Sequence, residues 1–400
     1  MKVIEINSIS GIQSTGRIVS NIKRELISKG HECLIAYGEQ ASTDIEGNYH
    51  IGSEIDRYIH ALKSRLFDTT GFESIRSTKK FISCIDAYQP DVVHIHNLHG
   101  YYINVDILFE YLAKKNIPVV WTLHDCWPFT GHCAHFMHVK CYKWKNGCFD
   151  CEQTHEYPTS WIIDRSKDNY IKKKNLFTAV NNLHIVTPSK WLESVVKESF
   201  LKNAQIHVIN NGVNIEIFKP GYEMKLGEEF SDKKIVLAVS SVWTDLKGYS
   251  DLKKIQCLLD KKKYKLVVIG VSQKQQDELS RENIFSIIRT ESQVELAKWY
   301  DKAFAFINPT YEDTFPTVNI ESLASGTPII TYMTGGSPEL VYDKCGVVVS
   351  VGDYEGMVKA LDGLEKNSEL CRSYGKNYCM LNMYKRYVEL IEDVATEKNI

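Results

Sequence analysis

The chain has 400 residues, so two domains are expected, because a single hydrophobic core stops growing at about 250–300 residues. Its 48 Lys and Arg nearly balance 50 Asp and Glu, which argues against an extended electrostatic surface for nucleic acid. With 44% apolar and 24% charged residues and no low-complexity tract, the composition is that of an ordinary globular protein.

Short apolar runs rich in Val and Ile recur through the first half of the chain, separated by stretches with helical spacing. This pattern is typical of strands that are buried on both faces of a parallel sheet. Between the first two runs, Ile18, Ile22 and Leu26 repeat at helical spacing, and Gly30 follows as a helix stop. The clearest predicted strands are residues 3–9, 33–37, 92–95, 119–124 and 184–189.

A glycine-containing loop follows the first predicted strand. Gly11 and Gly16 flank the start of the predicted helix, where a backbone without side chains can approach a phosphate or an acceptor closely. The residues after Gly16 are Arg17 and Ile18 instead of Lys and Ser or Thr, so the loop is not a P-loop. It also lacks the spacing of a Rossmann dinucleotide fingerprint.

A locally basic segment covers residues 57–81, with six Lys and Arg, two acidic residues and several apolar and aromatic side chains. Such a segment could lie on an anionic membrane or a lipid-diphosphate acceptor. A solvated helix face is the alternative interpretation.

Histidines stand at the ends of two predicted strands. His124 ends the run at 119–124 and Asp125 follows it, a position where a histidine either contacts a ligand or makes a structural hydrogen bond. His94 and His96 lie in the HIHN run that ends another strand. Strand alternation is expected to direct one of these two histidines into packing.

Cysteines cluster after His124. Four of them are separated by seven, six and two intervening residues, a density that is typical of a structural zinc site ordering a polar loop. Buried or incidental thiols are the alternative, and the spacing is not that of a known zinc finger. The predicted ligands are Cys133, Cys141, Cys148 and Cys151, with His132, His135 and His138 close by in the sequence.

After the breaks at Asn211-Gly212 and Pro220-Gly221, a second series of apolar runs begins. We therefore expect an α/β fold with two doubly wound sheets, whose ligands bind beyond the carboxyl ends of the strands. The active site is expected in the cleft between the two domains. The predicted strands of the second half are residues 235–241, 265–270, 284–288, 303–309, 327–332 and 346–350.

Residues 308–341 read as a strand end, a loop, a helix stopped by Gly326, a strand and a Gly-rich turn. The amides of Thr317 and Val318 at the helix start should lack helical partners, and the helix dipole favours a phosphate there. Asp313 precedes these amides and Glu321 lies one turn inside the helix. Alternatively, Asp313 caps the helix and Glu321 is a solvated helix residue.

This segment resembles the signature of retaining GT-B glycosyltransferases, the group 1 type of polysaccharide biosynthesis. That signature has a Glu, seven residues and a second Glu, then a small residue-Gly-x-Pro strand and a Gly-Gly-x-Pro-Glu turn. Here Asp313 replaces the first Glu, with Glu312 just before it. The resemblance implies that Glu321 binds the ribose of a nucleotide and that the first carboxylate contacts the donor sugar.

The resemblance extends to other segments. Lys247 lies in the Lys-Gly pair that binds the donor diphosphate in this family, although Val242 and Leu246 occupy the places of the usual arginines. The backbone of residues 289–291 is implied to hold the base. The implied catalytic residues are His124, Lys247 and Asp313, and the implied donor contacts are Gly16, Arg17, Arg289, Thr290, Glu291, Phe315, Thr317, Val318 and Glu321.

The implied reaction moves a sugar from a nucleoside-diphosphate sugar to an acceptor hydroxyl, with retention and without a metal at the diphosphate. The acceptor would be a glycan or lipid-linked oligosaccharide of bacterial capsule, O-antigen or exopolysaccharide. The expected domains are an acceptor domain at 1–218, to which a helix at about 381–400 returns, and a donor domain at 219–380. A nucleotide-sugar epimerase and a catalytically weak nucleotide-sugar-binding protein remain as alternatives.

The expected location is the cytoplasm, with peripheral contact to the inner face of the plasma membrane. The N-terminal residues lack the charged lead, apolar stretch and cleavage site of a signal peptide. No run of 18 apolar residues occurs elsewhere in the chain. The cysteines are accordingly expected to be reduced thiols or metal ligands.

Overall fold

The computed structural model describes residues 1–42 and 47–397. The chain divides into two compact units, the first formed by Met1–Ile209 with Tyr384–Ile400 and the second by Asn210–Met383. Among the described residues, no helix is both long enough and apolar enough to cross a membrane.

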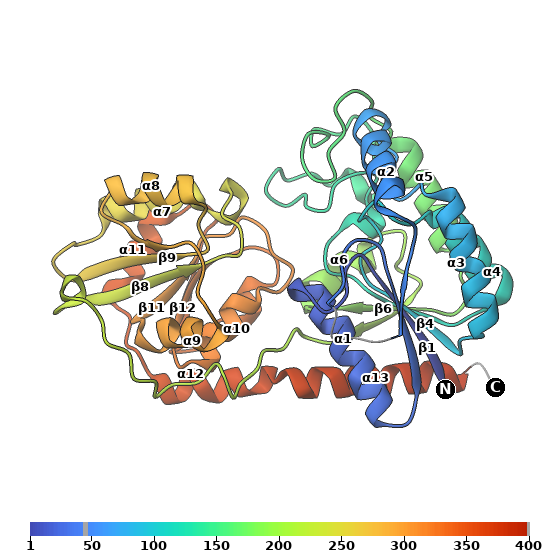
Figure 1. Cartoon of the computed structure of the whole chain (residues 1–400). Helices are drawn as coiled ribbons and strands as arrows, with labels where there is room; N and C mark the ends of the chain where they lie inside the picture. The colour runs from blue at the N-terminus through green and yellow to red at the C-terminus, as the bar shows by residue number, and fades with distance from the viewer. Residues whose placement is uncertain (43–46, 398–400) are drawn as a thin grey trace. The chain divides into compact units, whose positions relative to one another are not determined.

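The first unit contains a seven-stranded sheet in the order β3-β2-β1-β4-β5-β6-β7, and every neighbouring pair is parallel. Figure 1 labels β1, β4 and β6 of this sheet. Parallel strands need long crossovers, which here contain the helices that cover the sheet. The strands are β1 (Lys2–Asn7), β2 (Glu32–Tyr37), β3 (Asn48–His50), β4 (Val92–Ile95), β5 (Val119–Thr122), β6 (Leu183–Thr187) and β7 (Gln205–Val208).

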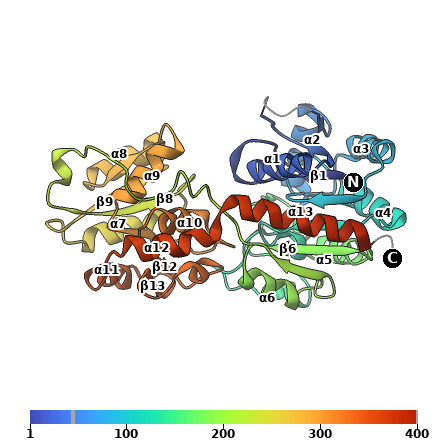
Figure 2. The same cartoon turned by 90° about the horizontal axis from the view of Figure 1, so that it is seen from below.

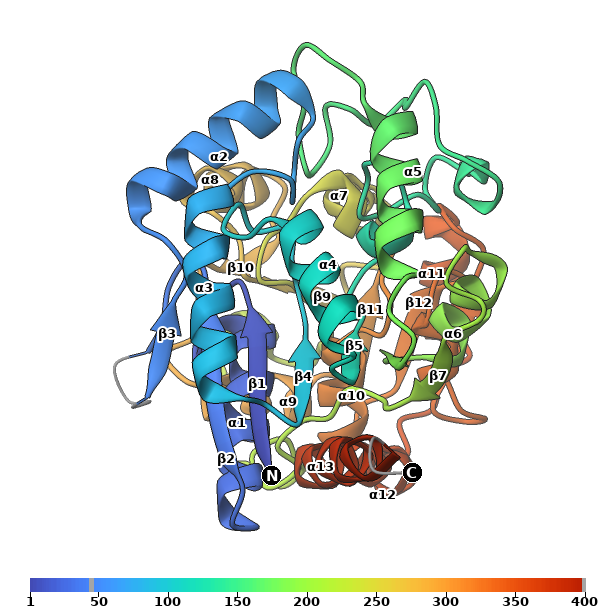
Figure 3. The ribbon, with the colours of Figure 1, turned by 90° about the vertical axis from the view of Figure 1, so that its right-hand side faces the viewer.

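Helices cover both faces of this sheet. On one face α3, α4 and α5 lie side by side and pack on the core that contains Ile4, Val93 and Trp121 (Figure 3). On the other face lie α1 and α13, the long helix in the foreground of Figure 2. The helices are α1 (Gln13–Ser28), α2 (Glu54–Phe67), α3 (Ile75–Tyr88), α4 (Val105–Lys115), α5 (Ser166–Phe177), α6 (Lys190–Glu198) and α13 (Met380–Glu397).

The second unit contains a six-stranded parallel sheet in the order β10-β9-β8-β11-β12-β13. Its core has two parts, one for each face of the sheet. One part contains side chains of the helices α9 (Gln293–Lys302), α10 (Thr317–Ala324) and α12 (Ser368–Gly375). The other contains side chains of α7 (Tyr249–Leu258), α8 (Gln273–Arg281) and α11 (Tyr354–Asp362). The strands are β8 (Lys234–Val239), β9 (Tyr264–Ile269), β10 (Phe285–Ile287), β11 (Ala305–Asn308), β12 (Ile329–Tyr332) and β13 (Gly346–Val349).

Helices α7, α8, α9 and α10 follow β8, β9, β10 and β11 in turn, as expected for crossovers between parallel strands. Only a 3-10 turn separates β12 from β13, and α11 and α12 follow β13 in succession. A 3-10 turn, η4 (Asp245–Lys247), joins β8 to α7.

Both sheets reverse their strand order at one point, between β1 and β4 in the first and between β8 and β11 in the second. In open parallel sheets, ligands bind outside the carboxyl ends of the strands at such a switch point. The expected α/β class with two doubly wound, Rossmann-like sheets is confirmed. The switch points therefore direct attention to the loops after β1, β4, β8 and β11.

Candidate active site

Lys247 lies at the switch point of the second sheet, at the end of η4. The next residue, Gly248, has a φ of 83°, and a Cβ there would lie only 2.2 Å from the carbonyl oxygen of Pro309. Only glycine allows the turn after β8 to pack this closely on the chain after β11. The contact brings the Lys247 ammonium to 2.8 Å from Oδ2 of Asp313.

The Asp313 loop is fixed from both sides. Oδ1 of Asp313 accepts the N–H of Phe315 at 3.1 Å, and its carbonyl accepts the N–H of Gly336 at 3.0 Å. A Cβ on Gly335, whose φ is 54°, would lie 1.9 Å from the same carbonyl. Glu312 is fully buried, whereas the side chain of Asp313 keeps 23% exposure, so Asp313 is the acidic residue that a ligand can reach.

Helix α10 begins beside this pair. Its N-cap residue is Pro316, whose ring cannot accept a hydrogen bond, and no side chain caps the helix. The first-turn N–H groups of Thr317 and Val318 have no helical carbonyl to bind, so an anion or solvent must satisfy them. The Phe315 side chain, in contrast, is 2% exposed and its carbonyl accepts from Asn211, so Phe315 holds the loop from inside.

Glu321 lies one turn into α10 and is half-buried. Burial raises the pKa of this carboxyl to about 7, and the hydrogen bond that it accepts from the hydroxyl of Tyr300 opposes that rise. The bond is 3.0 Å long, and Tyr300 itself is fully buried on α9. Glu321 is therefore not a freely solvated helix residue, and its charge changes near neutral pH. Sequence reasoning missed Tyr300, because a tyrosine in an amphipathic helix carries no distinguishing signal.

The predicted base-binding segment, residues 289–291, connects β10 to α9. Arg289 and Glu291 are exposed, and Thr290 is half-buried. The N–H of Glu291 donates to Oε2 of Glu295 at 2.6 Å, so this amide is already bonded within the chain.

In the first unit, Gly16 lies in the first turns of α1, close to the preceding loop. The N–H of Gly11 donates to its carbonyl at 3.0 Å, and a Cβ on Gly16 would lie 3.2 Å from the side chain of Ile9. Gly16 thus lets the loop fold tightly onto the helix. The neighbouring Arg17 is exposed.

His124 follows β5 and belongs to a buried network at the switch point of the first sheet. Its Nε2 lies 3.0 Å from Nδ1 of His96, whose Nε2 lies 3.1 Å from Oε2 of Glu5. Oε1 of the same carboxylate lies 2.9 Å from Nδ1 of His94, and Nε2 of His94 lies 2.9 Å from the hydroxyl of Thr122. Burial lowers the pKa of His94 and His96 to about 3 and that of His124 to about 4, so all three rings are neutral at pH 7.

The network determines which nitrogens carry protons. Burial raises the pKa of Glu5, and the hydrogen bond with His96 opposes that rise. When Glu5 is ionised it can only accept, so His96 then carries its proton on Nε2 and accepts on Nδ1. His124 then donates through Nε2, and its Nδ1 is an acceptor nitrogen. Glu5 thereby orients His124 through His96.

Two sequence interpretations change here. The expectation that one residue of the pair His94 and His96 points away into packing is wrong, because residues two apart share a face of a strand and both bond Glu5. Glu5 itself was missed, although an acidic residue inside the apolar run VIEINSI was a visible signal. The donor atoms of Glu5, His94 and His96 lie within 4.8 Å of one another, and both histidines hydrogen bond to the carboxylate of Glu5.

Within the second unit, the structure brings Lys247, Asp313 and the start of α10 together at one switch point. His124, Gly16 and Arg17 belong to the first unit. The four predicted zinc ligands, Cys133, Cys141, Cys148 and Cys151, also belong to the first unit and line one small cavity.

Family models match both halves of the chain. The model of Glycosyltransferase Family 4 matches residues 15–217, and the model of Glycosyl transferases group 1 matches residues 223–378. The two matches together include most of the described residues of both units.

Two bacterial relatives illustrate the similarity. The chain is 26% identical over 270 residues to the putative colanic acid biosynthesis glycosyl transferase WcaC of Escherichia coli K12, a match of 65% of this chain and 64% of the relative. It thus spans less than two thirds of that relative's length. Over 376 residues it is 21% identical to an uncharacterized 41.2 kDa protein in the cps region of Klebsiella pneumoniae, covering 90% and 96%.

Solved structures share the architecture at low sequence identity. Sucrose-phosphate synthase from Thermosynechococcus elongatus matches with a TM-score of 0.68, 16% identity and 99% coverage of each chain. Anabaena HepE in complex with UDP matches with a TM-score of 0.63 and 12% identity over 98% of this chain and 100% of that one. With the two Rossmann-like sheets described above, these neighbours are consistent with a GT-B fold.

Proposed function

Because the chain belongs to Glycosyltransferase Family 4, we propose that it transfers a sugar from a nucleoside-diphosphate sugar to an acceptor hydroxyl with retention at the anomeric carbon. One observation carries the proposal: Lys247 and Asp313 meet beside the uncapped start of α10, at the switch point of the second sheet. That position combines a fixed cation with unpaired amides, which is what a diphosphate needs.

The donor domain of this proposal is residues 219–380. Lys247 and the amides of Thr317 and Val318 bind the diphosphate and stabilise the charge of the leaving group, without a bridging metal. Asp313 contacts the donor sugar, and Glu321 accepts hydrogen bonds from the ribose hydroxyls.

The remaining contacts of the proposal are of two kinds. The backbone of residues 289–291 contacts the base. From the acceptor domain, residues 1–218 with the returning C-terminal helix, Gly16 and Arg17 approach the donor phosphate. His124, which the Glu5 network orients, contacts the donor sugar.

The Lys247–Asp313 ion pair suggests how the site accepts its donor. Each of the two side chains is partly exposed, 33% for the lysine and 23% for the aspartate, so solvent screens the pair and it is weak. A diphosphate can therefore replace the carboxylate of Asp313 as the partner of the Lys247 ammonium at a low cost in free energy. Asp313 is then released toward the sugar that the diphosphate carries.

The biological role that we propose is the synthesis of a bacterial surface polysaccharide. The named relatives support this role, since one is described as a colanic acid biosynthesis glycosyl transferase and another lies in a cps region. A sugar nucleotide as the donor is supported by similar structures that contain UDP or ADP.

Incubation of the chain with UDP-, GDP- and ADP-sugars, followed by product analysis, tests the proposal. Transfer, or slow donor hydrolysis in the absence of acceptor, supports it. A new sugar epimer would favour the epimerase, and binding without turnover would favour a binding protein, an alternative made relevant by Val242 and Leu246 at the places of the usual arginines.

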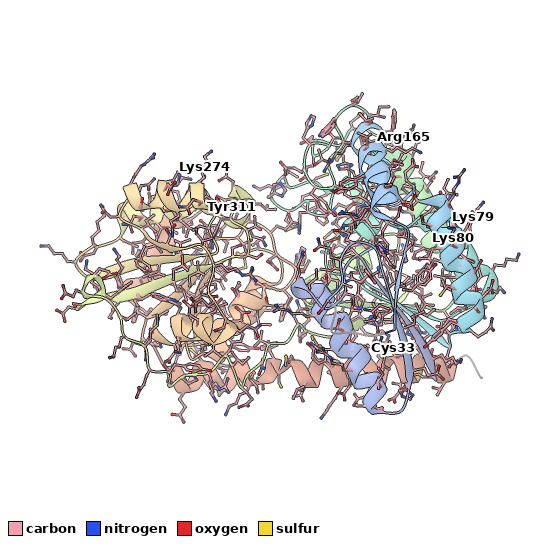
Figure 4. The ribbon with its side chains drawn as sticks, in the orientation of Figure 1. Cys33, Lys79, Lys80, Arg165, Lys274 and Tyr311 are labelled. Atoms are coloured by element: carbon pink, nitrogen blue, oxygen red, sulfur yellow. The ribbon has the colours of Figure 1, made fainter. Side chains whose placement is uncertain are left out.

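We also propose that the first unit contacts the inner face of the plasma membrane. Helix α2 exposes Ile55, Tyr58, Ile59 and Leu62, which are 50–70% exposed and repeat at i, i+3, i+4 and i+7. Lys79 and Lys80 are exposed on the neighbouring α3 (Figure 4). An apolar row with basic residues nearby is typical of interfacial helices.

Sedimentation with vesicles tests the membrane proposal. We expect the chain to bind vesicles that contain anionic lipid, and Ile59→Asp with Leu62→Asp to abolish the binding. Salt should weaken it, because the basic residues act through screened charge. Equal lack of binding at low and high salt would contradict the proposal.

A further inference from the structure

The segment between β5 and α5, residues 123–165, is long and nearly without regular structure. It contains two short 3-10 turns, η1 (Trp127–Phe129) and η2 (Lys143–Lys145). Connections of this length are uncommon in compact domains unless something else holds them together. The segment contains five cysteines, and four of them line one cavity together with His132. These four are Cys133, Cys141, Cys148 and Cys151.

The cavity has a volume of about 20 Å³, which is room for one water-sized occupant. The thiols of Cys133 and Cys151 lie beside it and interact with each other. Sγ of Cys148 accepts the N–H of Gly131 at 3.1 Å, and a Cβ on Gly131 would lie 2.7 Å from Cβ of Cys148. The glycine thus allows the two parts of the loop to approach at the cavity.

His132 has the hydrogen-bonding pattern of a metal ligand. Its Nδ1 lies 2.6 Å from Oδ1 of Asp68, and both side chains are at most 2% exposed. Its Nε2 is buried and has no hydrogen-bond partner. A histidine held by a carboxylate through one nitrogen, with the other nitrogen directed at a metal, is the usual outer-shell arrangement of zinc sites.

Asp68 is fixed in turn by its surroundings. It ends α2 with a φ of 52°, and its Oδ2 accepts the N–H of Arg165 at 2.9 Å. Arg165, labelled in Figure 4, ends the long segment, so one aspartate binds both the end of the segment and His132. Asn169 donates to the carbonyl of Asp68 at 2.8 Å.

A buried lysine, Lys173, lies beside the same cysteines. Lys173 is 1% exposed, and its ammonium donates to the carbonyls of Trp127 and Thr130 and lies 3.4 Å from the Trp127 ring centroid. Neighbouring negative charge offsets the cost of burying an ammonium. A divalent metal with three thiolates and one neutral imidazole carries one net negative charge, which one lysine balances.

We propose that Nε2 of His132 and the thiolates of Cys133, Cys148 and Cys151 bind one structural Zn²⁺ that orders residues 123–165. Sulfur and imidazole ligands in a closed set of four are those of structural zinc. Cys141 lines the cavity but is not a ligand in this assignment.

Binding requires a small movement of the ligands. Within residues 1–42 and 47–397, no three of these donor atoms lie within 4.8 Å of one another. Tetrahedral coordination at about 2.3 Å from zinc to sulfur brings sulfur atoms to roughly 3.8 Å. Metal binding therefore contracts the cavity. Removal of the metal should loosen residues 123–165 before the rest of the first unit.

Elemental analysis of the full chain, purified without chelator, tests the site. We expect about one zinc per chain, lost in Cys148→Ser with Cys151→Ser and strongly reduced in His132→Ala. Cys141→Ser and Cys257→Ser, a change at an exposed thiol of the second unit, should keep the metal. A wild-type chain that contains no metal and nevertheless has its full stability would overturn the proposal.

Zinc X-ray absorption identifies the ligands without any need for activity. We expect three sulfur neighbours at about 2.3 Å and one nitrogen at about 2.0–2.1 Å. Four sulfur neighbours, with zinc kept in His132→Ala and lost in Cys141→Ser, would overturn the assignment of His132. A chelator should accelerate proteolysis within residues 123–165 of the wild-type chain, and unchanged cleavage would contradict the structural role.

Discussion

Tyr300→Phe tests the carboxyl of Glu321 with little change in packing. The substitution keeps the ring, whose centroid lies 5.4 Å from that of Phe306 and 6.0 Å from that of Phe218, and removes only the hydroxyl that donates to Glu321. A hydrogen bond to a charged group is worth about 1.5–3 kcal/mol net. At 1.36 kcal/mol per unit, its loss should raise the pKa of Glu321 by about 1–2 units from its value of about 7.

The pH dependence of donor binding follows from the fraction of Glu321 that is ionised. If Glu321 accepts the ribose hydroxyls as a carboxylate, donor affinity is full above the pKa and falls as the pH drops through it. In the wild type that loss is centred near pH 7, and in Tyr300→Phe it should move to about pH 8–9. At pH 7 the variant should bind about 5–50-fold more weakly, whereas at pH 10 the two should be nearly equal.

Calorimetric titration with a nucleoside-diphosphate sugar from pH 5.5 to 10 measures the shift. The sugar nucleotide is the suitable ligand, because its diphosphate is esterified at both ends and does not titrate in this range. Glu321→Gln is the matched control and should bind weakly without this pH dependence. An unchanged midpoint in Tyr300→Phe, or the same pH dependence in Glu321→Gln, would refute the reasoning.

Stability supplies a second measurement that needs no ligand. The folded pKa of Glu321 is raised from 4.5 to about 7, so its contribution to stability is present below pH 4.5 and is lost as the pH rises through 7. The free energy of unfolding of Glu321→Gln, relative to the wild type, should therefore increase between pH 5 and pH 8 by up to about 3 kcal/mol. Urea unfolding at the two pH values measures it, and a constant difference would contradict the raised pKa.

Three further predictions concern the rest of the site. Lys247→Ala should lower turnover about 10²-fold or more, because it removes the cation that stabilises the charge of the leaving group. Steady-state kinetics measures the loss, with Lys274→Ala at an exposed lysine as the control. Equal rates of the two variants would contradict the role of Lys247. Gly248→Ala should weaken donor binding although Lys247 is intact, because the added Cβ would clash with the carbonyl of Pro309. Gly363→Ala is the control: its Cβ would have no atom within 4 Å, so donor binding should not change. Glu5→Gln should reduce kcat, because an amide at this position disturbs the hydrogen bonds that orient His124, whereas nucleotide affinity measured by titration should stay the same. An unchanged kcat would show that the network has no role in the mechanism.

The fold could be predicted because most of its strands are apolar runs separated by stretches with helical spacing. All six strands of the second unit coincide with predicted runs, and Gly30 and Gly326 follow α1 and α10 with φ of 84° and 80°. The edge strands β3 (NYH) and β7 (QIHV) were missed, because short polar edge strands lack the pattern of a buried strand.

The candidate site was predictable only in part. Local motifs indicate Lys247, Asp313 and the start of α10, since each depends on a turn and the residues next to it. Glu5 and Tyr300 act through contacts with residues 91 and 21 positions away, respectively, which no local pattern encodes. Likewise, the pairing of His132 with Asp68 joins a loop to the end of α2.

Donor binding to single-site variants of the second unit tests the central claim most directly. Titration of UDP-, GDP- and ADP-sugars at pH 8.5 should identify a donor that the wild type binds. Glu321→Ala should weaken that binding at least about tenfold, whereas Lys274→Ala on the exposed face of α8 should not change it. Equal affinity of the wild type and Glu321→Ala, with both proteins folded, would contradict the placement of the donor at the start of α10.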